Sequence, residues 1–187
     1  MNVYDFDKTI YYPDSSYSFF LFCLKHYPGA VLRTLPQTVI CSVRYACKSI
    51  RTKELKEQLF SFLRFLSDPE QTAERFWDEH FSGIGSWYLA QKKPDDLIIS
   101  ASPEFLVRVA AKRLGVSLLA TKMDPFSGRI EGENCHDREK VRRFFSAYPA
   151  GKIQGFYSDS LSDGPLAALA DKAFLVSRGK LSAWPEA

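Results

Sequence analysis

Residues 2–9 read Asn2-Val3-Tyr4-Asp5-Phe6-Asp7-Lys8-Thr9, a short strand pattern that runs directly into two aspartates. Side chains alternate along an extended segment, so Asp5 and Asp7 project from one face. Two carboxylates at so short a distance repel each other unless a cation lies between them or one of them binds a proton. Mg²⁺ commonly takes one or two carboxylates together with a substrate phosphate. The pair therefore indicates phosphate chemistry at a strand end, although a solvated turn explains so short a pattern about as well.

A second polar strand end follows the apolar residues Leu97-Ile98-Ile99. The chain continues as Ser100-Ala101-Ser102-Pro103-Glu104 and then as a helical pattern over residues 105–114. This order predicts a buried strand, a tight turn and a helix start. The free backbone N–H groups of that helix start and the hydroxyl of Ser100 would bind an anion. The alternative is that Ser100 or Ser102 is only a helix N-cap.

A lysine lies near the start of another predicted helix. Residues 134–143 follow a hairpin-like pattern that turns at Ser127-Gly128, and Asp137 is placed to cap a helix with Lys140 in its first turn. A positive charge there opposes the helix dipole, which gives weak support for an anionic group beside Lys140. A solvated helix face is the simpler interpretation of this basic run.

Two more acids follow a later strand pattern. Residues 153–165 end a strand at Asp159, place Asp163 four residues on, and lead through Gly164-Pro165 into a helical pattern. Asp159 is therefore in position to complete a metal site that Asp5 opens. The alternative is that Asp159 begins a turn and Asp163 caps the next helix.

Together these segments resemble the haloacid-dehalogenase-like superfamily, and within it the phosphatases related to phosphoserine phosphatase. The family's motifs are an aspartate-x-aspartate-x-threonine strand end, a strand-ending serine or threonine, a lysine, and a strand-ending pair of acids. The match covers residues 1–10 and about 93–176. Ala101-Ser102 stands where a near-glycine pair often follows the motif serine, so phosphoserine itself is not specified as the substrate. The matching residues are Asp5, Asp7, Thr9, Ser100, Lys140, Asp159 and Asp163.

The resemblance implies a mechanism that begins at Asp5. This carboxylate would attack phosphorus and form an aspartyl-phosphate, because a carboxylate is ionised at neutral pH and needs no base. Asp7 would protonate the leaving oxygen and then deprotonate the hydrolytic water. Dehalogenation has no leaving oxygen to protonate, so the presence of Asp7 favours phosphate chemistry.

The resemblance also implies Mg²⁺ as the cofactor. Its ligands would be the carboxylates of Asp5 and Asp159 and the main-chain carbonyl of Asp7. Asp163 would orient either Lys140 or a metal-bound water, and it is counted among the residues of the metal site.

Substrate contacts follow from the resemblance in the same way. Ser100 and the backbone N–H of Ala101 would hold phosphoryl oxygens, while Lys140 would balance the charge on Asp5 and on the phosphate. Thr9 is counted among the substrate-binding residues as well, and its hydroxyl would brace the loop.

The order of elements predicts an α/β fold with a Rossmann-like parallel sheet flanked by helices. Residues 1–10 and 93–187 would form the catalytic core. The predicted strands lie near residues 2–6, 96–100, 117–121, 153–158 and 173–176.

Residues 11–92 have helical patterns and match the helical cap of this branch of the superfamily. An apolar cluster lies within residues 19–24, an amphipathic stripe runs from Leu55 to Leu66, and a third helix is expected from Pro69 to about Phe81. A cap that closes would exclude water and select the leaving group. Four cap arginines are candidates for a second anionic group of the substrate, although a solvated surface position is more common: Arg33, Arg44, Arg51 and Arg64.

Bulk composition fits an enzyme that works on small molecules. The 187 residues include 45% hydrophobic and 25% charged residues, and the net charge of +3 is too small to indicate nucleic-acid binding. No apolar run reaches the length of a membrane span. Met1 leads directly into the first strand, which leaves no room for a signal peptide, and the four cysteines show no metal or redox spacing, so we expect a cytoplasmic protein. Nothing in the sequence specifies an oligomeric state.

The function expected from these features is Mg²⁺-dependent hydrolysis of phosphate monoesters, with a small phosphorylated metabolite as the substrate. Two alternatives stay open. One is a non-catalytic module that binds a phosphorylated ligand. The other is a phosphatase that acts on a lipid-linked phosphate, which the aromatic and basic cap suggests.

Overall fold

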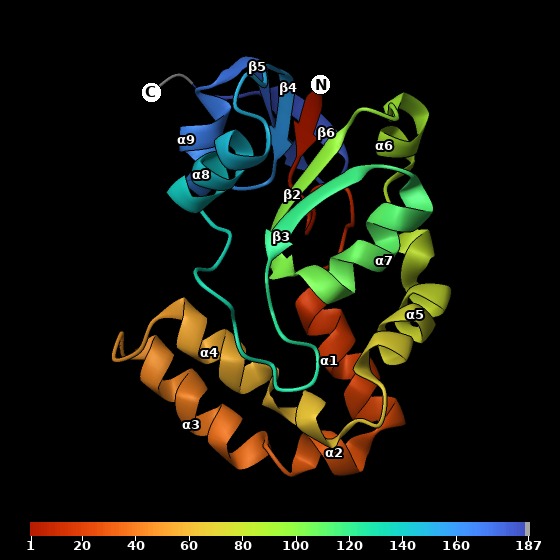
Figure 1. Ribbon diagram of the computed structural model, residues 1–187, viewed down its shortest axis with the longest axis vertical. Helices are drawn as coiled ribbons and strands as arrows, with labels where there is room; N and C mark the ends of the chain where they lie inside the picture. Colours follow the sequence, from red (N-terminus) through yellow and green to blue (C-terminus); the bar gives the residue numbers. More distant parts are fainter. Residues whose placement is uncertain (186–187) are drawn as a thin grey trace.

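The computed structural model describes residues 1–185 and places a six-stranded sheet at one end of the molecule (Figure 1). The strand order is β3-β2-β1-β4-β5-β6, in which the first five strands are parallel and β6 pairs antiparallel with β5. The predicted α/β fold with a parallel sheet is therefore confirmed. The strands are β1 (Asn2–Tyr4), β2 (Leu97–Pro103), β3 (Ser117–Thr121), β4 (Ile153–Ser158), β5 (Ala170–Ser177) and β6 (Lys180–Ala183).

Six α-helices lie between β1 and β2, and three follow in the remainder of the described chain. Of these, α2, α3 and α4 lie at the end of the molecule farthest from the sheet (Figure 1). No helix within residues 1–185 is long and apolar enough to cross a membrane. The helices are α1 (Ser15–His26), α2 (Pro28–Leu32), α3 (Leu35–Ala46), α4 (Thr52–Leu59), α5 (Pro69–His80), α6 (Ser86–Gln91), α7 (Glu104–Leu114), α8 (Arg138–Ala147) and α9 (Gly164–Ala167).

The topology brings the ends of β1 and β4 together. The chain passes from β1 to β2 and β3 on one side, and then returns to place β4 on the other side of β1. Tyr4 is in register with Tyr157, so the residues that leave these two strands emerge side by side. Ligands of parallel α/β sheets bind at the carboxyl ends of strands where the order reverses in this way.

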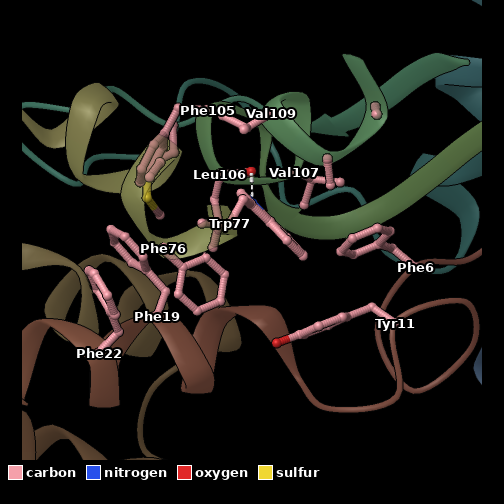
Figure 2. Close-up of a cluster of buried hydrophobic side chains, with 14 of the residues drawn as sticks. Phe6, Tyr11, Phe19, Phe22, Phe76, Trp77, Phe105, Leu106, Val107 and Val109 are labelled. Carbon is pink, nitrogen blue, oxygen red and sulfur yellow. Dashed lines mark hydrogen bonds between the residues drawn. The ribbon is translucent and has the colours of Figure 1, made fainter. Parts of the chain in front are cut away.

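An aromatic core joins the helices before β2 to the sheet domain. Phe19 of α1 packs edge-to-face on Phe76 of α5, with 5.5 Å between ring centroids, and also contacts Phe105 of α7 (Figure 2). Trp77 is fully buried, and its indole N–H donates a hydrogen bond of 2.7 Å to the carbonyl of Leu106. Helices α1 and α5 therefore share one continuous hydrophobic core with α7.

Two local predictions are corrected. Strand β2 continues past Ser100 to Pro103, and α7 follows at once, so there is no tight turn between them. The stripe from Leu55 to Leu66 is not one helix, because α4 ends at Leu59 and a 3₁₀ helix follows over Ser61–Phe65. The hydroxyl of Ser61 donates to the carbonyl of Gln58 at 2.7 Å, and this side-chain bond competes with the helical pattern.

The predicted turn at Ser127-Gly128 is closed by an antiparallel bridge between Met123 and Ile130. Gly128 has φ of +74°, and a Cβ atom there would lie 2.5 Å from the carbonyl oxygen of Phe60. Replacing Gly128 by alanine therefore combines left-handed strain with a backbone clash, and we expect the free energy of unfolding to fall by about 2–4 kcal/mol. Urea denaturation measures this loss.

Gly132 provides the matched control for that substitution. Its φ is +78°, but a Cβ atom there would meet nothing within 4 Å. Gly132→Ala should therefore cost only the conformational strain, about 1 kcal/mol. Equal losses at the two positions would show that the contact of Gly128 with Phe60 is unimportant.

Candidate active site

A cavity of about 450 Å³ lies where the order of the sheet reverses. The carboxyl groups that the sequence places after β1 and β4 converge there. Helices from the region between β1 and β2 form the opposite wall, through Tyr17 of α1 and Leu55, Lys56 and Leu59 of α4. The predicted site residues that line the cavity are Asp5, Asp7, Ala101, Lys140, Asp159 and Asp163.

Lys140 is buried between two carboxylates. Its Nζ atom lies 2.6 Å from Oδ1 of Asp5 and 2.7 Å from Oδ2 of Asp163, and its side chain is only 2% exposed. Burial alone would lower the pKa of Lys140, but the two carboxylates together raise it, so the lysine is positively charged. Burial raises the pKa of Asp5 to about 7, and the charge of Lys140 opposes that shift. The cluster of Lys140, Asp5 and Asp163 carries one positive charge and up to two negative charges.

Asp163 does not act as a helix cap, although it precedes α9. Its side chain makes no capping hydrogen bond. Instead, its Oδ2 atom accepts a hydrogen bond of 2.7 Å from the hydroxyl of Ser158 in addition to the one from Lys140. Its Oδ1 atom is buried and has no hydrogen-bond partner among the described residues.

Asp7 is held in place by two donors. Its Oδ1 atom accepts a 2.6 Å hydrogen bond from the backbone N–H of Ser15, and its Oδ2 atom accepts a 2.5 Å bond from the hydroxyl of Ser102. Burial raises the pKa of Asp7, and the nearby carboxylate of Asp14 raises it further. A raised pKa favours the protonated form of Asp7, which is the form that a general acid requires.

Thr9 links the two strand ends. Its Oγ1 atom lies 3.4 Å from Oδ2 of Asp5 and 3.5 Å from Oδ1 of Asp159, and it accepts a 3.0 Å hydrogen bond from the backbone N–H of Asp159. Thr9 is fully buried and does not line the cavity. Its place between the loops agrees with a bracing role, and it brings the carboxylates of Asp5 and Asp159 close to one hydroxyl.

The oxygen atoms at this site suit a hard cation. Asp5 and Asp159 present carboxylates from adjacent strands, and the buried Oδ1 atom of Asp163 lacks a partner, which in a native site calls for an ion or a water. Within residues 1–185, no three acidic, histidine or cysteine side chains are grouped closely enough to enclose an ion by themselves. A site with few protein ligands fits Mg²⁺, which keeps several waters and binds substrate phosphate.

Ser100 and Ala101 occupy different environments. Ser100 is fully buried and outside the cavity lining, and its Oγ atom accepts a 3.0 Å hydrogen bond from the N–H of Ser102. Ala101 lines the cavity, and its carbonyl accepts a hydrogen bond from Thr121. Neither Ser100 nor Ser102 caps α7, whose N-cap position is Pro103 without a side-chain bond, so that alternative is wrong.

The sequence prediction missed several residues that line the cavity, among them Ser102 and Lys56. Ser102 lines the cavity and holds Asp7. Lys56 reaches in from α4, and its Nζ atom donates to the carbonyl of Ala101 at 2.8 Å and to Oδ1 of Asn134 at 2.9 Å. Burial lowers the pKa of Lys56. None of the four arginines considered as substrate contacts lines this cavity.

The parallel sheet and the acidic cavity at its switch point are those of an α/β enzyme. A model of the haloacid dehalogenase-like hydrolase family matches residues 3–168. The chain therefore belongs to the haloacid dehalogenase-like hydrolase family, as the four motifs predicted.

Individual relatives share parts of this sequence and fold. Protein CicA of Caulobacter vibrioides is 33% identical over 92 residues, a match that covers 45% of this chain and 41% of CicA. A crystal structure of a protein of unknown function from Bordetella pertussis Tohama I has a TM-score of 0.72 at 22% identity and covers 92% of this chain and 87% of that one. A phosphoserine phosphohydrolase-like protein from Francisella tularensis has a TM-score of 0.53 at 17% identity, and the match covers 92% of this chain and 86% of that one.

Proposed function

We propose that this protein hydrolyses phosphate monoesters through an aspartyl-phosphate on Asp5. The observation that carries the proposal is the pairing of Asp5 with the buried cation of Lys140 in the same cavity as Asp7, a carboxyl group with a raised pKa. Lys140 offsets the repulsion between the Asp5 carboxylate and an incoming phosphate. Asp7 supplies the proton that an alkoxide leaving group needs.

The reaction takes place in two displacements. A carboxylate oxygen of Asp5 forms a bond to phosphorus as the ester P–O bond breaks, and Asp7 donates its proton to the departing oxygen. Asp7 then accepts a proton from water as that water attacks phosphorus, which releases inorganic phosphate and restores Asp5. Asp5 and Asp159 would hold Mg²⁺, with Asp163 nearby, and the ion would neutralise negative charge at the phosphoryl group.

We further infer that residues 1–10 and 93–187 form the catalytic core, of which 186–187 lie outside the described residues, and that residues 11–92 form the cap. Lys56 of α4 lies in the cavity wall, where it is placed to contact the leaving group of a small phosphorylated metabolite. All four cysteines are free, which agrees with action in the reducing cytoplasm.

Hydrolysis of p-nitrophenyl phosphate tests the proposal. The purified protein should release p-nitrophenol with Mg²⁺ present and lose that activity with excess EDTA. A panel of phosphorylated metabolites would then identify preferred leaving groups. If no phosphate ester is turned over while phosphorylated ligands still raise the melting temperature, the protein is a binding module and not a phosphatase.

Removal of the Asp159 carboxylate should weaken metal binding more than it changes stability. For Asp159→Asn we expect the Mg²⁺ dissociation constant to rise about tenfold or more. The free energy of unfolding should change little, because Asp159 is partly exposed and its side chain has only the long contact with Thr9. Isothermal titration calorimetry with Mg²⁺ measures the affinity.

Asp14→Asn is the matched control for Asp159→Asn. Asp14 lines the same cavity and caps α1 by accepting a hydrogen bond from the N–H of Tyr17. Asparagine caps a helix as well as aspartate, so this variant removes one cavity charge without loss of the cap. If the two variants bind Mg²⁺ equally, Asp159 has no specific role as a ligand.

A further inference from the structure

Helix α3 lies at the end of the molecule that is farthest from the sheet (Figure 1). It exposes an apolar face there. Val39, Ile40 and Val43 are 54%, 59% and 59% exposed, and Thr38 is the one residue that this helix buries. The main neighbours of α3 are α4 and α2, which cover one side of it. Adjacent exposed aliphatic side chains on an outer helix indicate an interaction surface.

The apolar face continues into a groove beside the active site. A cavity of about 570 Å³ is lined by side chains of α1, α3 and α4 that are mostly apolar, including Phe20 and Val43. Tyr17 and Leu59 belong to the walls of both this groove and the active-site cavity. An acyl chain in the groove would therefore extend from the surface of α3 toward the active-site cavity.

The chain segment that contains α3 is basic. The nearest acidic side chains are Glu54 and Glu57 of α4, which line a cavity together with Cys41 of α3. The sequence from Ser15 to Lys53 contains no aspartate or glutamate, whereas the rest of the chain has more acidic than basic residues. On α3 itself, Arg44 lies next to the aliphatic face, and Arg33 and Lys48 flank the helix. The lysines and arginines of this segment are Lys25, Arg33, Arg44, Lys48, Arg51 and Lys53.

We propose that the face formed by α3 docks on an anionic lipid bilayer and that the phosphatase acts on a phosphate ester of a lipid. The aliphatic side chains of Val39, Ile40 and Val43 enter the boundary between headgroups and acyl chains, while the flanking cations bind lipid phosphates. An acyl chain in the groove directs the headgroup phosphate toward Asp5. The substrate part of this proposal rests on the proposed function, whereas the docking part does not.

A second copy of the chain is a poorer occupant of this face. Two copies that met through α3 would bring the two groups of basic side chains together, and the nearest acids, Glu54 and Glu57, lie on α4 and not on α3 itself. Such like-charge contact opposes association. An anionic bilayer supplies both the apolar layer and the opposite charge.

Vesicle flotation tests the docking. The whole chain should float with phosphatidylcholine vesicles that contain phosphatidylglycerol, and not with vesicles of phosphatidylcholine alone. Added salt should weaken the binding. Ile40→Glu places a charge in the apolar face and should reduce binding about fivefold or more, because each charge near the surface alters partitioning by about that factor. Leu181→Glu on β6, at a side chain 43% exposed, should bind like the unsubstituted chain.

Two activity assays separate the possible outcomes. Ile40→Glu, at a residue that lines neither the groove nor the active-site cavity, should hydrolyse p-nitrophenyl phosphate at the normal rate but lose hydrolysis of phosphatidic acid in vesicles. If the protein floats but hydrolyses neither substrate, the docking is supported and the proposed function is wrong. If the protein does not float, the docking is wrong. The docking is also wrong if the unsubstituted protein sediments as a dimer that Ile40→Glu converts to a monomer, which would assign the face to a second copy.

Discussion

Asp5→Asn should lower kcat for p-nitrophenyl phosphate by about 10⁴-fold or more, with the fold retained. An amide oxygen is a poor nucleophile toward phosphorus, and loss of a group that forms the covalent intermediate removes most of the catalysis. The substitution keeps the shape of the side chain, and Lys140 keeps its second partner, Asp163. Urea denaturation should therefore show a change much smaller than the change in rate.

The covalent intermediate gives this prediction a second measurement. Acid quenching during turnover, followed by mass spectrometry, should find one phosphoryl group on the peptide that contains Asp5, and none in Asp5→Asn. Asp14→Asn removes a different carboxylate from the same cavity and should keep the labelled peptide. Its rate should fall far less than that of Asp5→Asn, because Asp14 acts only through the pKa of Asp7. A labelled peptide elsewhere in the chain, or a near-normal rate in Asp5→Asn, would exclude Asp5 as the nucleophile.

The residues that sequence analysis placed in the cavity share one property: their positions are fixed by local structure. Asp5 directly follows β1 and Asp159 directly follows β4. Parallel pairing in register then brings the two strand ends together without further information. Lys140 could be placed in the first turn of α8 for the same reason, although its contact with Asp5 spans most of the chain.

The features that sequence analysis missed depend on packing between distant elements. In the sequence, Lys56 is an ordinary polar residue on an amphipathic helix. Its side chain points into the cavity only because α4 packs close to Asn134. Helix α3 carries valine and isoleucine at core-like spacing, yet the structure leaves them exposed. Strand β6 has only four residues, all of them exposed, and it pairs with β5 through a hairpin at Arg178-Gly179. An alternation as short as Lys180-Leu181-Ser182-Ala183 does not by itself indicate a strand.

Lys140→Met should lower the free energy of unfolding by about 3–5 kcal/mol, the largest stability change we expect in this site. The substitution keeps the length of the side chain but leaves the carboxylates of Asp5 and Asp163 buried next to each other without a cation. Urea denaturation in EDTA measures the loss without a contribution from bound metal.

The loss should depend on pH in a defined direction. Burial raises the pKa of Asp5 to about 7, so the folded state binds a proton there more tightly than the unfolded chain does. Such a group favours folding at low pH and disfavours it as pH rises through the folded pKa. Without Lys140 this pKa should rise further, because the cation opposes the shift. The substitution Lys140→Met should therefore lower the free energy of unfolding less at pH 5 than at pH 8.

The double variant Lys140→Met with Asp163→Asn separates the charge effect from lost packing. If buried negative charge causes the instability, removal of the Asp163 charge should restore part of the stability, and the two substitutions should be strongly non-additive. Asp163→Asn alone should be destabilising, since it weakens the hydrogen bonds from Lys140 and Ser158. Additive losses that are the same at pH 5 and pH 8 would mean that Lys140 contributes through packing alone, and its role in balancing the charge of Asp5 and the phosphate would then be wrong.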